Sequence, residues 1–154
     1  MLGVTLYTGL KFLHVLSAIV AVGANTTYGL WLTRARSSPE HEEFALRGIK
    51  VLDDRIANPT YAVLLVTGIL TALDGHWSFG QLWIALGIGL YVLLAVIAAI
   101  VFTPSLRQQI EVLASEGRDS PRYAQLATRV QASGAVLGVI VVGVVFIMVT
   151  KPTI

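Results

Sequence analysis

The stretch LKFLHVLSAIVAVGANTTYGLWL, residues 10–32, decides the fold of this chain, because it is long and apolar enough to cross a membrane. A helix needs about 20 apolar residues to cross a hydrocarbon core of about 30 Å. Three further runs approach that length, at residues 59–73, 82–102 and 130–149. Each run must be helical, because an isolated strand leaves its backbone groups unpaired in lipid. The sequence therefore predicts one all-α domain over residues 1–154, an integral membrane bundle of four transmembrane helices.

The composition agrees with this assignment. Hydrophobic residues make up 55% of the chain and charged residues only 13%, whereas a soluble domain carries about a quarter charged residues. There is no cysteine, which excludes disulfides, thiolate metal sites and iron–sulfur clusters. The net charge of +2 is too small to indicate a nucleic-acid partner, so the lipid bilayer is the partner that the composition predicts.

The basic residues predict the orientation of the four spans. Residues 33–57 hold five arginines and lysines, residues 103–129 hold four, and residues 74–81 hold none. Loops rich in lysine and arginine stay in the cytoplasm. We therefore expect a multi-pass protein of the cytoplasmic (inner) membrane with both termini outside.

Both basic loops carry apolar residues at helical spacing, in the first at Ala45, Ile49, Leu52 and Ile56, and in the second at Leu106, Ile110 and Leu113. This spacing predicts two amphipathic cytoplasmic helices that lie on the membrane surface or extend the spans. The alternative is a pair of solvated linkers. Pairs four residues apart, Glu43 with Arg47 and Lys50 with Asp54, support the first of these helices.

Helix boundaries are predicted at the prolines. Asn58 suits an N-cap and Pro59 the first helical position, so a new helix is expected to begin there. Pro104 is expected to end the third span. Ser120 followed by Pro121 predicts a helix that continues into the fourth span.

Glycines and aromatic residues are predicted to be structural. Gly134 and Gly138 form a G-x-x-x-G pair on the fourth span, a spacing that lets helices approach closely. These glycines pack the bundle or a homo-oligomer, or they leave room for a flat ligand. Six aromatic residues fall at the predicted interfaces, where such rings anchor helices: Tyr7, Trp77 and Trp83 outside, and Tyr28, Trp31 and Tyr61 inside.

The first span carries polar side chains that require an explanation, because polar groups in a membrane are costly. Lys11, His14 and Ser17 share one helical face. Lys11 can extend its amine to the outer boundary. His14 is a candidate ligand for haem iron or copper, since imidazole is a common ligand for both; alternatively, it is hydrogen-bonded to a neighbouring carbonyl or to water. Asn25 is expected to make one bond between helices.

Depth in the membrane predicts the partners of His14. Met148, near the outer end of the fourth span, and His76, in the outer loop, lie at the same level. Histidine with methionine, or two histidines, can ligate a b-type haem, and imidazole with thioether also suits copper. Met148 taken alone is more often a core residue. The candidate cofactor-binding residues are therefore His14, Met148, His76 and Lys11, with His14 as the candidate metal ligand, and the absence of any cofactor is the alternative.

The pattern Leu10, Lys11, Leu13 and His14 resembles a superfamily of small four-helix membrane proteins. It includes the CopD-type copper-resistance proteins, the HemJ-type protoporphyrinogen oxidases and a group of uncharacterised predicted integral membrane proteins. The chain is most similar to that last group, also in the stretch from Asp54 to Pro59 and in the Thr67-Gly68 pair. The resemblance implies a b-type haem on His14, or copper handling at the outer side. The third span lacks the basic residue of the HemJ-type proteins, so the resemblance does not imply porphyrinogen oxidation.

Three functions are consistent with these patterns. The first is membrane redox chemistry by a cofactor on His14, with a membrane redox partner. The second is a structural or scaffold protein that oligomerises through its glycines and binds no cofactor. The third is transport of copper or another small solute, which the absence of a carboxylate in the four apolar runs disfavours. The adjacent pair Asp53 and Asp54 is interpreted as part of a surface salt-bridge cluster.

Overall fold

The computed structural model describes residues 5–152, and all regular structure within that range is helical. The elements are α1 (Leu6–Ser37), the short 3-10 turn η1 (Pro39–His41), α2 (Glu42–Leu52), the π turn η2 (Asp53–Ala57), α3 (Asn58–Asp74), α4 (Leu82–Ile97), the π turn η3 (Ala98–Phe102), α5 (Thr103–Glu116) and α6 (Pro121–Thr150).

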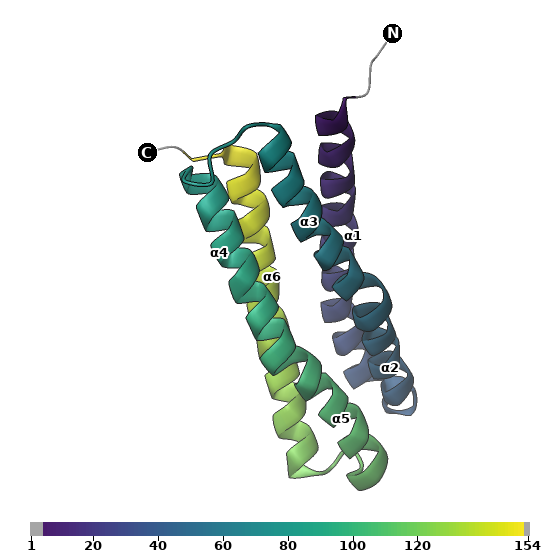
Figure 1. Ribbon diagram of the computed structural model, residues 1–154. Helices are drawn as coiled ribbons and strands as arrows, with labels where there is room; N and C mark the ends of the chain where they lie inside the picture. Colours follow the sequence, from purple (N-terminus) through teal and green to yellow (C-terminus); the bar gives the residue numbers. More distant parts are fainter. Residues whose placement is uncertain (1–4, 153–154) are drawn as a thin grey trace.

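These elements join into four rods that are long and apolar enough to cross a membrane, Leu6–Ser37, Pro39–Asp74, Leu82–Glu116 and Pro121–Thr150. The prediction of an all-α bundle with four membrane-spanning helices is confirmed. The start of α1, the end of α6 and the connection between α3 and α4 lie at one end of the bundle, here called the terminal end (Figure 1). The opposite end holds α2, α5 and the connection to α6, and we call it the basic end. That the basic end faces the cytoplasm stays a prediction.

The second and third rods each pass through a proline without a break, contrary to the prediction of boundaries at Asn58 and Pro104. Proline has no N–H to donate, and its ring collides with the carbonyl four residues earlier. In both rods a π turn precedes the proline: the Asn58 N–H donates to the Asp53 carbonyl, and the Thr103 N–H to the Ala98 carbonyl. The wider turn accommodates the ring, so α2 and α5 extend the spans.

Other helix ends follow the predictions. The Ser120 side chain accepts a hydrogen bond from the Arg122 N–H at 3.2 Å and caps α6, with Pro121 at its first position. Helix α6 then continues into the fourth span, as expected. Gly117 follows α5 with φ of 82°, a backbone conformation that favours glycine. The ion pairs predicted on the first basic loop, Glu43 with Arg47 and Lys50 with Asp54, are both formed.

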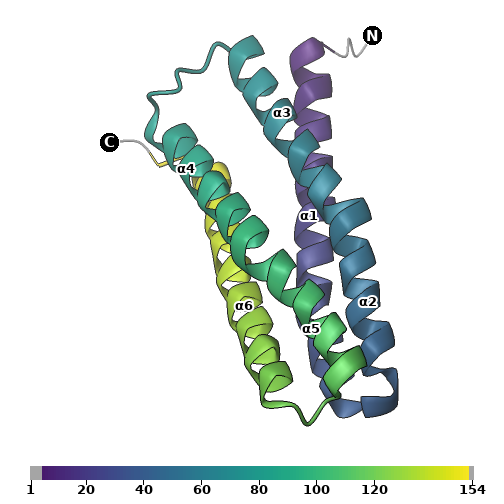
Figure 2. The same ribbon diagram turned by 60° about the horizontal axis from the view of Figure 1, so that its bottom comes forward.

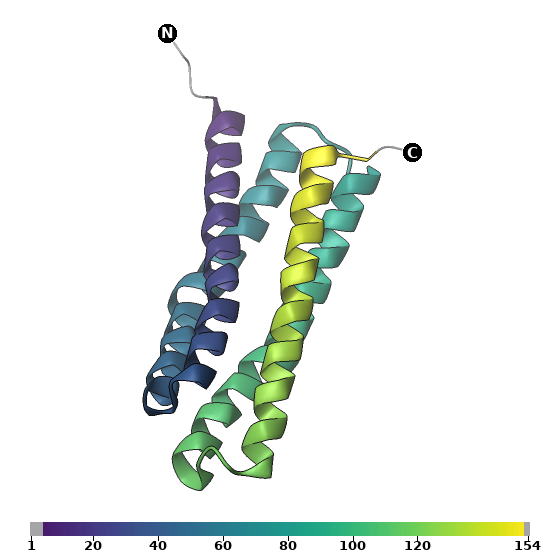
Figure 3. The same cartoon turned by 180° about the vertical axis from the view of Figure 1, so that it is seen from behind.

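The rods pack as two hairpins. Helix α1 lies against α2 and α3, and α6 lies against α4 and α5. The two hairpins meet mainly through α1 with α6 and through α2 with α5, which lie side by side at the basic end (Figure 2). Seen from behind, α1 and α6 are neighbours that run in opposite directions (Figure 3). The main core lies in the basic half, around Tyr28, Phe102, Leu106, Val130 and Leu137.

The prediction for the packed face of α2 is confirmed at Ala45 and Ile49, and Leu52 is partly buried, but the prediction is wrong at Ile56 and misses the acidic residues of this face. The buried residues are Glu42, Ala45, Leu46 and Ile49, followed by Asp53 and Ala57 of η2, whereas Ile56 is 41% exposed. The stripe 42, 46, 49 and 53 has helical spacing, but an acidic residue occupies each end. This face packs against α1 and α5. The large apolar residues left exposed, among them Phe12, Ile100, Val139 and Phe146, form a surface suited to lipid.

Candidate functional site

His14 lies in the seam between α1 and α3, half-buried. Its Nδ1 atom is 2.9 Å from the Leu64 carbonyl oxygen and 3.4 Å from the Thr67 hydroxyl. Its ring lies over Gly68, where an added Cβ would stand 2.8 Å from the imidazole Cε1 atom. A side chain at position 68 would therefore collide with the ring. The Thr67-Gly68 pair is the part of α3 that lets this imidazole enter the seam.

The bond to Leu64 determines the protonation of the ring. A carbonyl oxygen can only accept, so Nδ1 carries the proton, and a neutral imidazole then has its lone pair on Nε2. Among residues 5–152, none forms a hydrogen bond with Nε2 of His14. Metal-ligating histidines are typically held in this way, with one nitrogen donating to a carbonyl and the other left for the metal. The alternative from the sequence, a hydrogen bond to a neighbouring carbonyl, is therefore formed, and it uses the single N–H of the neutral ring.

The other candidate ligands lie elsewhere at the terminal end. Met148 of α6 packs on α4, where its methyl group would meet a Cβ added at Gly87. His76 is exposed in the connection between α3 and α4, with Nδ1 2.9 Å from the Asp74 carbonyl oxygen and φ of 55°. The Lys11 side chain is exposed, and its amine lies 5.9 Å from the centre of the Tyr7 ring. The structure thus places these side chains in separate parts of the terminal end.

Aromatic residues gather at this end as well. The Trp77 and Trp83 rings meet edge to face at 5.6 Å, and the Lys151 amine lies 4.9 and 5.0 Å from their centres. A Cβ added at Gly75 would stand 2.8 Å from the Tyr7 ring. These contacts join the connection between α3 and α4 to the end of α6. The cluster therefore anchors loop and helix ends at the level predicted for the interface.

The described residues contain no group of three or more histidine, aspartate or glutamate side chains placed to hold a metal ion. Copper bound by protein alone needs several side-chain ligands. A haem needs fewer, because the porphyrin supplies four nitrogen ligands and the protein one or two axial ones. Of the two cofactors predicted from the sequence, the side-chain arrangement around His14 therefore suits haem better.

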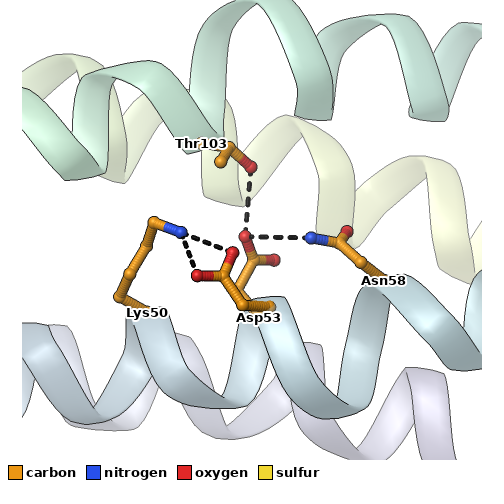
Figure 4. A network of polar contacts seen from close by, with 5 residues as sticks. Lys50, Asp53, Asn58 and Thr103 are labelled. Atoms are coloured by element: carbon orange, nitrogen blue, oxygen red, sulfur yellow. Dashed lines mark hydrogen bonds and ion pairs between the residues drawn. The ribbon is translucent and has the colours of Figure 1, made fainter.

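Asp53 is a second polar centre, and the prediction of a surface salt-bridge cluster is wrong for it. Its side chain lies between the two proline-containing rods, and the residue is only 6% exposed (Figure 4). Its Oδ2 atom accepts from the Thr103 hydroxyl at 3.1 Å and from the Asn58 amide at 3.5 Å. Asn58 therefore binds the carboxylate instead of capping a helix. Only Asp54 makes the predicted ion pair, with Lys50, whose own side chain is 14% exposed.

A third polar cluster closes the basic end. Glu42, which is 2% exposed, accepts a hydrogen bond from the Tyr123 hydroxyl of α6, which in turn accepts from the Gln109 amide of α5 at 3.1 Å. The second carboxylate oxygen lies 3.1 Å from Nε of Arg118 and is held there by charge, without an aligned hydrogen bond. Arg118 also donates to the Arg36 carbonyl at 2.7 Å. The cluster joins α1, α2, α5 and α6.

Deeper in the first span the prediction for Asn25 is confirmed, but one prediction for aromatic residues is wrong. The Asn25 amide donates to the Tyr61 hydroxyl of α3, and the Thr26 and Thr27 hydroxyls donate to carbonyls of their own helix. Tyr28, in contrast, is no interfacial anchor: it is 4% exposed and stacks with Phe102 at 6.1 Å between ring centres. Sequence reasoning missed Asp53, Glu42 and Tyr28 as buried polar groups.

Comparison with known proteins gives one result. The DUF2269 family, described as a predicted integral membrane protein, matches residues 8–152. The chain belongs to this family. The match confirms the resemblance to the group of predicted integral membrane proteins, and nothing found connects the chain with the CopD-type or HemJ-type proteins. Neither a curated protein nor a solved structure matches it. The protein is therefore a multi-pass integral membrane protein, as expected for a chain that resides in a lipid bilayer.

Proposed function

We propose that this DUF2269 protein binds a b-type haem at its terminal end, with Nε2 of His14 as an axial ligand to the iron. The observation that carries the proposal is the state of the imidazole. Its Nδ1 is occupied by the Leu64 carbonyl, whereas its Nε2 lone pair is engaged by no residue in the range 5–152. The ring is thereby oriented as in metal-ligating histidines. A bound haem supplies reversible one-electron chemistry, which suits exchange with a membrane redox partner.

The residues of α3 set the properties of this ligand. The bond from Nδ1 to the Leu64 carbonyl raises the basicity of the opposite nitrogen, and this strengthens ligation. Thr67 adds a hydroxyl 3.4 Å from Nδ1, and Gly68 gives the ring its space. Met148 and His76 remain the candidates for the second axial position. Met148 would have to turn away from Gly87, whereas the His76 side chain is already exposed.

Replacing His14 with alanine is expected to abolish haem binding. The protein is purified in detergent and titrated with haem, and the Soret absorbance is followed. Wild type is expected to bind one haem per chain. His14→Ala is expected to lose at least 90% of the bound haem, because the axial bond from imidazole is then missing. Absorption spectra of the Met148→Leu and His76→Ala variants then identify the second axial ligand. Replacing that ligand is expected to change the spectrum of a six-coordinate haem iron.

The control is His41→Ala, which removes an exposed histidine at the basic end and is expected to bind haem like wild type. Elemental analysis for copper accompanies the titration. Wild-type protein that stays colourless after haem is added would refute the proposal. In that event copper at one equivalent per chain supports the metal alternative, and a protein without haem or copper supports the scaffold alternative.

Substituting alanine for Gly68 tests the orientation of the ring separately from its presence. The added methyl group would stand 2.8 Å from Cε1 and 3.1 Å from Nδ1 of His14, so the ring must leave the Leu64 carbonyl. Haem affinity is expected to fall by about tenfold to a hundredfold, the usual cost of losing the group that orients a ligand. The readout is the dissociation constant for haem and the position of the Soret band.

Gly89→Ala is the matched control, because a Cβ at this helical glycine meets nothing within 4 Å. It is expected to leave haem affinity unchanged. If Gly68→Ala binds haem as tightly as Gly89→Ala does, the bond between His14 and Leu64 has no part in ligation.

A further inference from the structure

A cleft of about 450 Å³ opens between α1 and α6 in the basic half of the bundle. It is separate from the His14 seam, which lies between α1 and α3. One wall is formed by Tyr28 and Phe102, and another by small residues of α6 around Gly134. Arg36 and Ser37 of α1 also line it, at the end of that helix. The cleft has the size of a site for a small molecule or for part of a lipid.

The cleft runs from the membrane boundary towards the middle of the bilayer. Along α1 its lining residues extend from Arg36 back to Asn25, which corresponds to about 16 Å at 1.5 Å per residue. Arg36 lies just beyond the apolar run of residues 10–32. Half of a hydrocarbon core is about 15 Å thick. The cleft therefore spans the depth of one leaflet, the leaflet on the side of the basic end.

The charge at the mouth of the cleft is not neutralised. Arg36 makes no ion pair with any carboxylate among residues 5–152, and its guanidinium has only a long bond of 3.5 Å to the Ala127 carbonyl. Gln131, also in the lining, makes no side-chain hydrogen bond with the described residues. A guanidinium matches a phosphate group in charge and geometry. An anionic group is therefore the ligand that this mouth would attract.

The inner part of the cleft is walled by the rings of Tyr28 and Phe102, which stack on each other. The rest of the inner lining is apolar or small, with Gly29, Leu32, Gly134 and Leu137. A ligand with an acyl chain suits this lining.

We propose that the cleft between α1 and α6 holds one anionic phospholipid of the leaflet at the basic end. Its phosphate lies at Arg36, and one acyl chain extends along Gly29 and Gly134 towards Tyr28 and Phe102. The anionic charge, the single-leaflet depth and the mixed lining together select this occupant over a free phosphate, which would leave the inner cleft empty. The site fills the seam between the two hairpins, so its lipid contributes to the packing of α1 against α6.

The test is native mass spectrometry of the detergent-purified full chain with phosphatidylglycerol or phosphatidylcholine of identical acyl chains. Wild type is expected to retain one phosphatidylglycerol with about fivefold preference, the contribution of one arginine beside an anionic headgroup. Arg36→Gln is expected to lose the preference. Gly29→Phe is expected to lose both lipids, because its ring enters the cleft, where a Cβ at Gly29 meets no atom within 4 Å.

Gly23→Phe is the matched control. Gly23 is also exposed on α1 with open space around an added Cβ, but it does not line the cleft, so lipid retention is expected to equal that of wild type. Equal retention of the two lipids by wild type, or undiminished retention by Gly29→Phe, would overturn the proposal. Soluble glycerol phosphate is the third probe. If it competes as strongly as the lipid, the cleft is a phosphate site and the lipid assignment is wrong.

Discussion

Replacing Asp53 with alanine is expected to lower the free energy of unfolding by about 2 kcal/mol, because the Thr103 hydroxyl and the Asn58 amide both lose their acceptor away from water. The carboxylate joins the π turn of one proline-containing rod to the start of α5 in the other. Its loss therefore loosens the contact between the hairpins. The measurement is unfolding in mixed detergent micelles, followed by far-ultraviolet circular dichroism.

Glu43→Ala serves as the control, because its side chain is 48% exposed and pairs with Arg47, which is 59% exposed, on the same helix. Exposed pairs of this kind contribute about 0.5 kcal/mol or less. Thr103→Val removes the partner hydroxyl with little change in shape. In a double-mutant cycle, Asp53→Ala and Thr103→Val are expected to couple by about 1 kcal/mol. Equal destabilisation by Asp53→Ala and Glu43→Ala, without coupling to Thr103, would contradict the role assigned to the buried carboxylate.

The number of the spans could be predicted from the sequence, because lipid imposes one strong requirement on the backbone. The prolines could not be interpreted as reliably. In water, Asn58-Pro59 is a good helix start, and Pro104 a good stop. Between packed rods the backbone adopts a π turn before each proline, and both helices continue. Whether a proline ends or widens a helix depends on neighbouring rods, and one sequence does not show them.

The packed face of α2 illustrates the same limit. The apolar pattern favoured a face through Ala45, Ile49, Leu52 and Ile56. The packed face keeps the first two, leaves Ile56 exposed and also runs through Glu42 and Asp53. Hydropathy alone assigns acidic residues to the solvent. Their partners, Tyr123 and Thr103, are more than 45 residues away in the sequence. A signal was nevertheless present: positions 42, 46, 49 and 53 share one helical face with the apolar residues between them.

The candidate site was found by depth and residue type, and its surroundings were not. His14 could be selected because an imidazole in an apolar run requires an explanation. That its Nδ1 bonds to Leu64 depends on the pairing of α1 with α3, which hydropathy does not determine. The cleft could not be predicted from the sequence for a similar reason. Tyr28 was interpreted as an interfacial anchor, and only the packing of α1 against α6 and η3 shows it buried beside an open volume.

Removing Glu42 is expected to have the larger effect on stability. Glu42→Ala should lower the free energy of unfolding by about 3 kcal/mol, since it deletes a charge-assisted hydrogen bond and a paired charge from a buried site. Glu42 is 2% exposed, and it holds Tyr123 of α6 and Arg118, which follows α5. The loss is expected in the same detergent unfolding measurement, together with faster proteolysis at the connection between α5 and α6.

Two variants separate the charge of Glu42 from its hydrogen bond. Glu42→Gln keeps an oxygen that can accept from the Tyr123 hydroxyl but removes the attraction to Arg118, so its destabilisation should lie between that of wild type and Glu42→Ala. Glu43→Ala, which removes a 48% exposed side chain, should cost about 0.5 kcal/mol or less. If Glu42→Gln is as damaging as Glu42→Ala, the charge dominates and Arg118 is the partner that matters. If Glu42→Gln equals wild type, the hydroxyl of Tyr123 is the essential contact, and Tyr123→Phe must then reproduce most of the alanine effect.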